Sequence, residues 1–519
     1  MEFKVKMLEN ENWWGGSNND GIRMPFNKDT DFKGSFLKSA SGEAMPLYIS
    51  DKGRAIWSEK PFSFEIKEGE FSLSGEGEFF LEEFGSSLKD AFRGARAKYF
   101  PSDKRKLNRD FFKTAQYNTW IECLYDQNQE HIMKYAEAII ENGFEPGILM
   151  IDEGWHGRYG IWDFDRTKFP DPKGMVDKLH EMGFKVLLWV VPWVCPDGEF
   201  FFTALRESNA RHENDAENRL FIRQKQDPYF PALYHWWNGF SALLNLANEE
   251  DRKFLDDQLQ FLMKEYGIDG FKFDGGSVGA YSNCITGETN TDLTPHELNF
   301  YWNKFASEYD YHEYKDTYCG AQFNTIQRLS DRSHQWEDSI GFSSILPCSI
   351  AQGLIGHPFI CPDMVGGGSW EDFKPGKPID GELFVRWAQA SALFPMMQYS
   401  KAPWDALSEE RCRLVLEAGK LHKAFTDEII EMVERAEESG EPILRNLEYN
   451  YPNQGFATIN DEFMLEDKYL VAPVLQKGAR ERRVILPEGE WQADDGKIYM
   501  EGEHLIECPL DRLIYFKKI

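Results

Sequence analysis

The sequence contains no long apolar run, no cysteine cluster and no apolar leader at its N-terminus. No apolar stretch approaches the roughly 18 residues that span a bilayer, so we expect no membrane-spanning helix. Residues 1–9 lack an apolar segment with a small-residue cleavage site, so we expect no secretory signal. The eight cysteines are scattered without a Cys-x-x-Cys pair, which argues against a zinc cluster and against a disulfide framework. We therefore expect reduced thiols and a cytoplasmic protein.

Basic residues are also scarce: 58 Lys and Arg residues stand against 87 Asp and Glu residues, for a formal net charge of −29 at pH 7. A surface of this sign repels nucleic-acid phosphates and anionic lipids, so we expect neither nucleic acid nor a membrane as a partner. The charge also argues against a strongly anionic substrate, although its main effect is on solubility. The sequence leaves open whether the chain forms a homo-oligomer.

The chain is long and rich in aromatic residues. Its 519 residues exceed one ordinary domain. A hydrophobic content of 42% with 28% charged residues is typical of a folded protein with a buried core, and it excludes intrinsic disorder. Aromatic residues make up 15% of the chain and include 16 Trp. Packing against sugar rings and ordinary filling of the core both explain this content.

The spacing of apolar residues divides the chain into three parts. Residues 1–110 contain short alternating segments, such as 62–67 and 70–75, separated by turns with glycine, which predicts an N-terminal β-sandwich domain. Residues 111–432 alternate apolar strands with helices and are long enough for eight such units. Short strands return in residues 433–519, which we interpret as a C-terminal β-sandwich domain.

The central part predicts a parallel sheet. Its expected strands cover residues 117–122, 147–152, 184–193 and 268–274, and its expected helices cover residues 129–141, 173–182 and 249–266. Strands that are apolar on both faces and are joined by helices require parallel pairing with right-handed crossovers. The predicted fold class is therefore α/β: a (β/α)8 barrel flanked by the N-terminal β-sandwich and the C-terminal β-domain.

Polar and aromatic side chains lie at the ends of these strands, where (β/α)8 barrels carry their active sites. Asp152, Glu153 and Trp155 lie at the end of the strand over residues 147–152, and Trp189 and Trp193 lie in the last part of the strand over residues 184–193. Lys272 and Asp274 end the strand over residues 268–274, and Asp363 lies farther along the chain. A single carboxylate in such a place often caps the following helix. Several of them on one rim, beside tryptophans, predict a substrate site.

Lys272 lies two residues before Asp274 in one strand, so both side chains point to the same face. A lysine beside a carboxylate lowers the pKa of that carboxylate and keeps it ionised, as a nucleophile requires. Asp274 is therefore the candidate nucleophile.

A second reactive carboxylate is expected in the polar segment 328–338, just before an apolar stretch over residues 341–354 that we interpret as helical. Asp338 in that place is also a good helix N-cap. Spacing alone does not distinguish among Asp331, Glu337 and Asp338.

Several motifs in this order resemble glycoside hydrolase family 31. In the predicted barrel they are residues 151–155, 270–276, 359–367 and 384–395, and near the C-terminus they are residues 442–445, 470–475 and 486–491. The resemblance covers residues 113–500. Residues 11–17 are similar to the N-terminal segment that reaches toward the active site in this family.

The resemblance implies a metal-independent and cofactor-free retaining exo-α-glycosidase that acts on an oligosaccharide or glycoside. It assigns Asp274 as the nucleophile and Asp338 as the acid/base, because the family has a Trp shortly before that Asp and Trp336 is present here. Many members have one residue more between the two, which leaves Glu337 as an alternative. In the same comparison Arg328 and Asp152 fall on positions that hold sugar hydroxyls. Lys272 is expected to help orient the sugar, and Trp189 and Trp193 are expected to form a wall.

One departure from the family bears on the substrate. Many α-glucosidases of the family carry Arg-x-His after a Phe-x-Pro segment, and this His holds a glucose hydroxyl. Here the segment reads Phe394-Pro-Met-Met-Gln398-Tyr-Ser400, without a histidine. We expect Gln398 and Trp336 to be among the substrate-binding residues. This version of the segment, together with Asp363-Met-Val-Gly-Gly, is similar to the branch that contains bacterial α-galactosidases. We therefore expect an α-galactosidase, and the alternatives are an α-glucosidase, an α-N-acetylgalactosaminidase, a transglycosylase or a non-catalytic sugar-binding relative.

Overall fold

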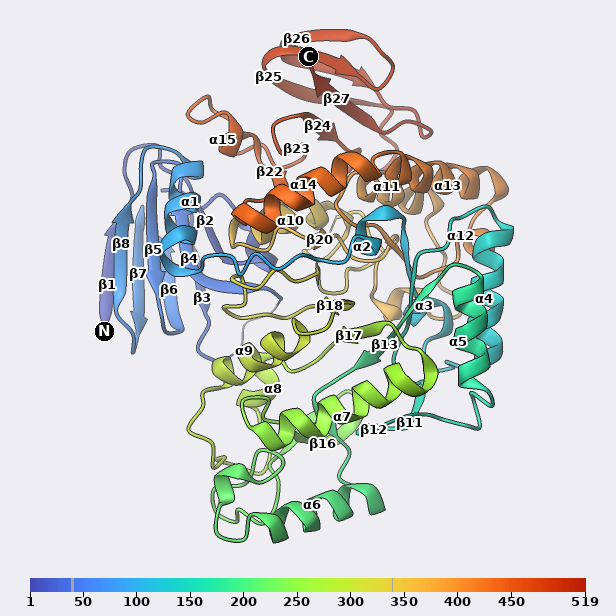
Figure 1. Cartoon of the computed structure of the whole chain (residues 1–519). Coiled ribbons are helices and arrows are strands. Elements are labelled where there is room, and N and C mark those ends of the chain that lie inside the picture. The colour runs from blue at the N-terminus through green and yellow to red at the C-terminus, as the bar shows by residue number, and fades with distance from the viewer. Residues whose placement is uncertain (39–41, 338) are drawn as a thin grey trace.

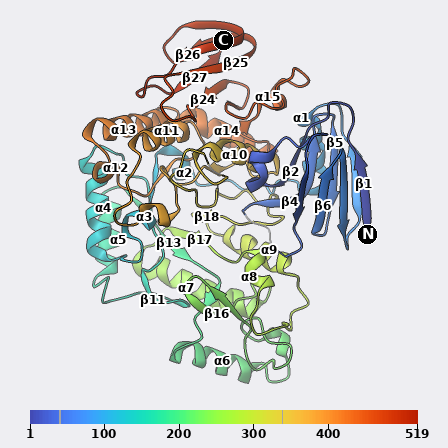
Figure 2. The same ribbon diagram turned by 180° about the vertical axis from the view of Figure 1, so that it is seen from behind.

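The computed structural model describes residues 1–38, 42–337 and 339–519 (Figure 1). Asp338, to which the family resemblance assigns the acid/base role, lies outside the described residues. Figures 1 and 2 show N-terminal sheets on one side of a central barrel and a C-terminal sheet at one end of it.

The described residues of the N-terminal part form two four-stranded antiparallel sheets. One sheet contains β1 (Glu2–Lys6), β7 (Glu70–Gly75), β6 (Phe62–Lys67) and β3 (Phe32–Ser35), and the other contains β2 (Trp13–Ser17), β4 (Ala44–Ser50), β5 (Arg54–Ser58) and β8 (Phe79–Glu83). Aromatic rings fill the space between them: Trp13 lies 5.4 Å from Phe71, and Tyr48 lies 5.4 Å from Phe64, between ring centroids. The predicted N-terminal β-sandwich is confirmed. The short helix η1 (Asn18–Arg23) follows β2, and α1 (Leu88–Tyr99) follows β8.

In the part of the chain that the structure describes, eight parallel strands form the barrel. Their order is β20 (Ile360–Cys361), β19 (Gln327–Arg328), β18 (His312–Tyr314), β17 (Gly270–Phe273), β13 (Lys185–Val190), β10 (Ile148–Ile151), β9 (Gln116–Asn118) and β21 (Gln398–Tyr399). The two edges meet where the Val365 N–H donates to the Gln398 carbonyl at 2.8 Å. The predicted (β/α)8 barrel is confirmed.

Helices cover the outside of the barrel (Figures 1 and 2). The longer ones are α4 (Gln129–Glu141), α5 (Pro172–Glu181), α7 (Glu249–Tyr266), α9 (Pro295–Ala306), α10 (Ile345–Leu354), α11 (Gly381–Ser391), α13 (Glu409–Ala424) and α14 (Thr426–Ser439). The predicted bounds of α4 and α7 are confirmed. Asn128 and Asn248 cap their N-termini, and Gly267 ends α7 in the left-handed region at φ 80°.

The predicted strand over residues 117–122 is wrong in its second half. Strand β9 ends at Asn118, and residues Trp120–Cys123 form the helical turn α3. The cause is local, because the Asn118 side chain accepts a hydrogen bond from the Trp120 N–H at 2.8 Å and turns the chain. This turn places Trp120 at the mouth of the barrel.

A small insertion lies between β13 and α7 (Figure 1, green). It consists of a three-stranded antiparallel sheet and two helical segments: β14 (Trp193–Val194), β16 (Gly239–Leu243), β15 (Leu233–Trp236), α6 (Glu199–Arg211) and η2 (Ala216–Asn218), all within the described residues. The hairpin β11 (His156–Arg158) and β12 (Ile161–Phe164) precedes it. The remaining short segments near the barrel are α2 (Asp110–Lys113), α8 (Val278–Ser282), η3 (Phe342–Ser344), η4 (Trp370–Phe373) and α12 (Pro403–Ala406).

The described residues after α14 pair in one six-stranded sheet, which lies beyond α11, α13 and α14 from the barrel (Figure 1). Its strands are β22 (Leu444–Arg445), β23 (Phe463–Leu465), β24 (Tyr469–Ala472), β27 (Ile514–Lys518), β25 (Glu481–Ala493) and β26 (Ile498–Glu507), with α15 (Leu447–Asn450) between β22 and β23. None of the helices in the described ranges combines the length and the apolar character needed to cross a membrane.

Candidate active site

A cavity of about 770 Å³ opens at the C-terminal ends of the barrel strands, and we call it the barrel cavity. It is lined by Trp120, Tyr125, Asp152, Glu153, Trp189, Trp193, Tyr234, Trp237, Asn238, Lys272, Asp274, Gly275, Ser277, Lys315, Asp316, Ser330, Asp331 and Trp370. Six residues predicted from the sequence therefore meet in one place: Asp152, Glu153, Trp189, Trp193, Lys272 and Asp274.

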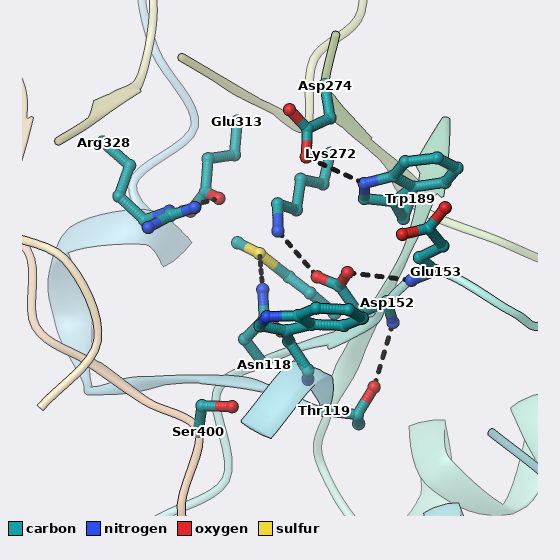
Figure 3. Close-up of polar contacts among 12 residues, drawn as sticks. Asn118, Thr119, Asp152, Glu153, Trp189, Lys272, Asp274, Glu313, Arg328 and Ser400 are labelled. Atoms are coloured by element: carbon teal, nitrogen blue, oxygen red, sulfur yellow. Dashed lines mark hydrogen bonds and ion pairs between the residues drawn. The ribbon is translucent and has the colours of Figure 1, made fainter. Parts of the chain in front are cut away.

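Lys272 and Asp152 form a buried ion pair on the floor of this cavity (Figure 3). The Lys272 Nζ lies 2.6 Å from Asp152 Oδ2, and both residues are 3% exposed. The Asp152 N–H in turn donates to the Thr119 hydroxyl at 2.9 Å. The ammonium group of Lys272 is thus bonded to Asp152, and its charge also helps to lower the pKa of Asp274, as the sequence predicted.

Asp274 follows β17 and is held from two sides. The indole N–H of Trp189 donates to Asp274 Oδ2 at 2.9 Å (Figure 3). The Gly275 N–H donates to Oδ1 at 2.8 Å. Burial alone raises the pKa of Asp274, but the nearby charges of Lys315 and Lys272 and the Trp189 hydrogen bond outweigh it and lower the pKa. Asp274 therefore faces the cavity as an ionised carboxylate.

Lys315, which the sequence did not predict as a site residue, is the main cation beside Asp274. Its Nζ lies 3.7 Å from Asp274 Oδ2 and 3.2 Å from Asp331 Oδ1, so these two oxygens are no more than about 7 Å apart. Burial opposes the charge of Lys315, but the two carboxylates raise its pKa above the usual value. Lys315 follows β18, which is only three residues long and gives no apolar run that marks a strand end in the sequence.

Asp331 lies in the loop after β19 and contacts two cations, Lys315 and Arg328. The Arg328 Nη2 is 3.1 Å from Asp331 Oδ1. Burial raises the pKa of Asp331, but Lys315 and Arg328 outweigh this effect and lower it. Arg328 also pairs with Asp363, which accepts the Arg332 N–H at 2.7 Å and so fixes the start of the loop.

Two further carboxyl groups in the cavity have raised pKa values. Burial raises the pKa of Glu153 to about 7, against the hydrogen bonds from Trp237 and Tyr159 that lower it. Burial also raises the pKa of Asp316 to about 7, with Lys315 opposing it. At neutral pH the cavity therefore combines ionised and partly protonated carboxyl groups.

The other predicted substrate-binding residues lie behind the cavity wall and do not line it. Arg328 and Asp363 are fully buried, and the Gln398 side chain donates to Glu313 at 2.6 Å. The indole N–H of Trp155 donates to the carbonyl of Trp189 at 2.9 Å. These residues support the lining from outside.

Neither of the two residues that precede the predicted acid/base Asp338 lines the barrel cavity. The indole of Trp336 is half-buried, and its N–H donates to Asp380 at 3.1 Å. Glu337 is exposed and does not line the cavity, and Asp338 is outside the described residues.

The N-terminal motif over residues 11–17 contacts the site only indirectly. Trp13 and Trp14 are buried in the β-sandwich. The following Asn19 accepts a hydrogen bond from Arg332 at 3.1 Å, one residue after Asp331. In the described ranges, no three His, Cys, Asp or Glu side chains are grouped so that they could hold a metal ion.

Two family descriptions match the chain. The Glycosyl hydrolases family 31 TIM-barrel domain matches residues 112–417, which is more than half of the chain. The Glycosyl hydrolase family 31 C-terminal domain matches residues 440–518.

Curated proteins with these similarities include two glycosidases. Myogenesis-regulating glycosidase of Mus musculus is 29% identical over 446 residues, which cover 83% of this chain and 60% of that protein. Alpha-glucosidase 2 of Bacillus thermoamyloliquefaciens is 26% identical over 425 residues, which cover 76% of this chain and 51% of that protein. The matches thus extend over only about half to three fifths of the length of these relatives.

Solved structures show the same fold. A sulfoquinovosidase of family GH31 from E. rectale in complex with an aza-sugar inhibitor superposes with a TM-score of 0.83 at 16% identity, covering 100% of this chain and 82% of that one. A GH31 dextranase from Flavobacterium johnsoniae complexed with glucose superposes with a TM-score of 0.82 at 19% identity, covering 100% and 66%. At these identities the likeness concerns the fold.

Proposed function

Because the chain belongs to glycoside hydrolase family 31, we propose that it is a retaining exo-acting α-glycosidase and that its substrate is an α-galactoside. Asp274 is the nucleophile, and a second carboxyl group is the acid and base. The chemistry needs neither metal nor cofactor, because two carboxyl groups supply the nucleophile, the proton and the base.

The observation that carries this proposal is the pair of carboxylates on one lysine. Asp274 and Asp331 both contact Lys315, and their nearest oxygens are within about 7 Å of each other. Retaining glycosidases hold their two carboxyl groups about 5–5.5 Å apart, whereas inverting enzymes need about 6.5–9.5 Å to admit a water molecule. The upper limit set by the shared lysine admits the shorter separation, and membership of family 31 is what favours the retaining route.

In the first step, Asp274 attacks the anomeric carbon while the acid gives its proton to the leaving oxygen. The bond to the leaving group breaks, and a glycosyl ester of Asp274 forms. In the second step the same acid, now a carboxylate, takes a proton from water, and the hydroxyl group replaces Asp274 at the anomeric carbon. The sugar is released with its original α configuration.

We propose Asp331 as the acid/base on the strength of its place in the barrel cavity, and Asp338 is the alternative from the family resemblance. Lys315 and Arg328 keep Asp331 ionised, which suits the second step. For the first step Asp331 must carry a proton, so we expect substrate binding to move Lys315 away from it.

The choice of galactose rests on the residue that replaces the glucosidase histidine. Gln398 is buried, does not line the cavity, and its amide nitrogen donates to Glu313, so it does not take the place of the sugar-binding histidine. The same sequence segment is similar to the α-galactosidase branch of the family. An α-glucosidase is the second candidate, because alpha-glucosidase 2 is among the relatives.

A panel of 4-nitrophenyl α-glycosides tests the proposal. We expect the highest kcat/KM with the α-galactoside, lower values with the α-glucoside and the α-N-acetylgalactosaminide, and none of this activity in Asp274→Ala. A preference for the α-glucoside would mean that the substrate is an α-glucoside, and it would leave the proposed mechanism unchanged. A complete lack of hydrolysis, with the sugars still bound, would favour a non-catalytic sugar-binding protein.

We also propose a reducing compartment, the cytoplasm, as the site of action. All eight cysteines are free, and four of them are buried. Free thiols at this number are typical of reducing compartments. Fractionation of cells followed by immunodetection tests this assignment.

A further inference from the structure

One carboxylate of the barrel cavity, Glu153, is buried beside neutral donors. Glu153 is 3% exposed and follows Asp152 at the end of β10. Within the described residues, the side chains that donate to it are those of Tyr159, Trp237 and Asn238. Burial of a carboxylate without a cation is costly, so these hydrogen bonds must hold it in place.

The donors come from the insertion and from the hairpin before it. Trp237 and Asn238 are the two turn residues between β15 and β16. The Trp237 Nε1 is 2.9 Å from Glu153 Oε2 and 3.2 Å from Oε1, and the Tyr159 hydroxyl is 2.8 Å from Oε1. The Asn238 amide donates to Oε1 and, at 2.7 Å, to the Tyr159 oxygen. Through these hydrogen bonds Glu153 connects the turn between β15 and β16 to the end of barrel strand β10.

The Trp237 side chain is held in place by its neighbours and is also exposed to the cavity. Its indole N–H points inward to Glu153, and its ring packs against Trp236 and Trp193 with centroid distances of 4.9 and 5.6 Å. The residue nevertheless remains 56% exposed and lines the cavity. An indole held by its N–H and packed on one side presents its remaining surface to whatever enters the cavity.

Other aromatic side chains surround the same mouth. Trp120 and Tyr125 lie after β9, with ring centroids 5.4 Å apart, and Trp370 lies after β20. Tyr125 is 45% exposed and Trp370 is 39% exposed, and all three line the cavity. The nucleophile Asp274 lies deeper, at the end of β17, and is only 8% exposed, so these rings face the part of the substrate that leaves.

We propose that Glu153 sets the specificity for the leaving group by holding Trp237 as a platform on which the ring of that group packs. The favoured leaving group is a pyranose or an aryl ring, because a flat indole surface contacts a ring over a larger area than it contacts a short alkyl group. The inference rests on the proposed glycosidase function. Glu153 is in this account a positioning residue that acts through Trp237.

The variant Glu153→Gln separates this role from a direct contact with the sugar. The amide oxygen of Gln can still accept from Tyr159 and Asn238 at the position of Oε1. Its NH2 group then stands where Oε2 accepted the 2.9 Å hydrogen bond from Trp237, so the variant removes the shorter of the two Trp237 contacts and leaves the 3.2 Å contact with the oxygen at the Oε1 position. Trp237→Ala removes the platform itself. Phe240→Ala is the matched control, because Phe240 is 49% exposed on the same hairpin but does not line the cavity.

The test compares kcat/KM for the 4-nitrophenyl and the methyl α-glycoside of the sugar that the wild type prefers. We expect Glu153→Gln and Trp237→Ala to lower the value for the aryl glycoside by about 3- to 10-fold, the range of one lost aromatic contact. The value for the methyl glycoside should stay within about twofold, and Phe240→Ala should match the wild type on both. The double variant should resemble Trp237→Ala alone, because both changes remove one platform.

Two results overturn the inference. An equal loss of kcat/KM on both substrates would mean that Glu153 acts on the sugar ring or on folding. An unchanged ratio of the aryl value to the methyl value in all variants would mean that Trp237 is not a platform for the leaving group. If the wild type hydrolyses no α-glycoside, the proposed function fails and this inference falls with it. A wild type that is active, with variants whose substrate ratio is unchanged, fails this inference alone.

Discussion

At the scale of single residues, charge decides which carboxyl group in the barrel cavity reacts as a nucleophile. Asp274 and Glu153 are both buried, and burial raises the pKa of each. Of these two, Asp274 has Lys315 and Lys272 close enough to reverse the effect, so its pKa is lowered whereas the pKa of Glu153 is raised. A carboxylate that remains ionised while shielded from water is suited to attack an anomeric carbon.

Replacing the nucleophile should stop turnover. Asp274→Ala is expected to lower kcat on a 4-nitrophenyl α-glycoside by at least about 10⁴-fold, because the glycosyl ester can no longer form. Azide should restore part of the activity by filling the space of the lost carboxylate and attacking the anomeric carbon. An unchanged melting curve controls for folding, and near-normal turnover in the variant would contradict the assignment.

The acid/base is identified by its dependence on the leaving group. Without its acid, the enzyme should lose cleavage of natural oligosaccharides but keep much of its rate on aryl glycosides whose phenols leave unaided. We expect this behaviour for Asp331→Ala, with Asp338→Ala as the parallel measurement and Glu337→Gln as the exposed control. Finding it in Asp338→Ala alone would move the role to the position that the family resemblance indicates.

At the scale of elements, the sequence predicted the long helices and the apolar strands well. The helices over residues 129–141 and 249–266 carry both a regular apolar spacing and explicit caps, which fix their ends. Strand β18 has three residues and no such pattern, so Lys315 at its end was missed. The substrate-binding assignments of Arg328 and Gln398 named residues that are buried behind the cavity, a distinction that depends on packing rather than on local sequence.

The end of helix α14 is expected to be a stability element. Glu437 is buried and accepts from the Leu107 N–H at 2.7 Å and from Arg109 at 2.6 and 2.9 Å. Glu437→Ala leaves these donors without their acceptor, so we expect a loss of about 2–4 kcal/mol in the free energy of unfolding. Glu438→Ala, at the neighbouring half-exposed position, should change it by less than about 1 kcal/mol. Equal melting temperatures for the two variants would contradict this.

At the scale of the whole molecule, the N-terminal β-sandwich and the barrel meet next to the active site. Asn19, in the short helix η1 that follows β2, accepts from Arg332, which comes one residue after Asp331 in the loop after β19. The Ala44 N–H donates to the Thr317 carbonyl beside Lys315 and Asp316 at 2.8 Å. The two loops that carry Lys315 and Asp331 thus rest on the N-terminal domain; the family resemblance led us to expect an approach from residues 11–17, whereas the contacts come from Asn19 and Ala44.

Buried histidines should make the folded chain sensitive to acid. His312 is 1% exposed; its Nδ1 bonds to the Tyr309 carbonyl at 2.9 Å and its Nε2 accepts from the Ile326 N–H at 3.1 Å, which requires the neutral ring. Burial lowers its pKa to about 4, below the reference of about 6.5 for an unfolded chain. The unfolded state therefore binds the proton first, and stability is lost as the pH falls from about 6.5 to about 4.

Each such histidine should lower the free energy of unfolding by up to about 1.4 kcal/mol for each pH unit of acidification between about pH 6.5 and about pH 4. Denaturant unfolding between pH 7.5 and pH 5 measures the slope. We expect a shallower slope in His312→Gln and an unchanged one in His131→Gln, because His131 is exposed on the surface of α4. The same slope in the wild type and in His312→Gln would show that this histidine is not a cause of the acid sensitivity.

The central claim is that two carboxylates sharing Lys315 perform a double displacement through Asp274. Proton NMR of the first minutes of hydrolysis, before the released sugar mutarotates, observes this directly. Two displacements at one carbon restore its configuration, so the account predicts that the α-anomer of the released sugar appears first and the β-anomer follows by mutarotation. The β-anomer appearing first would mean a single displacement by water, and it would contradict the role of Asp274 as a nucleophile.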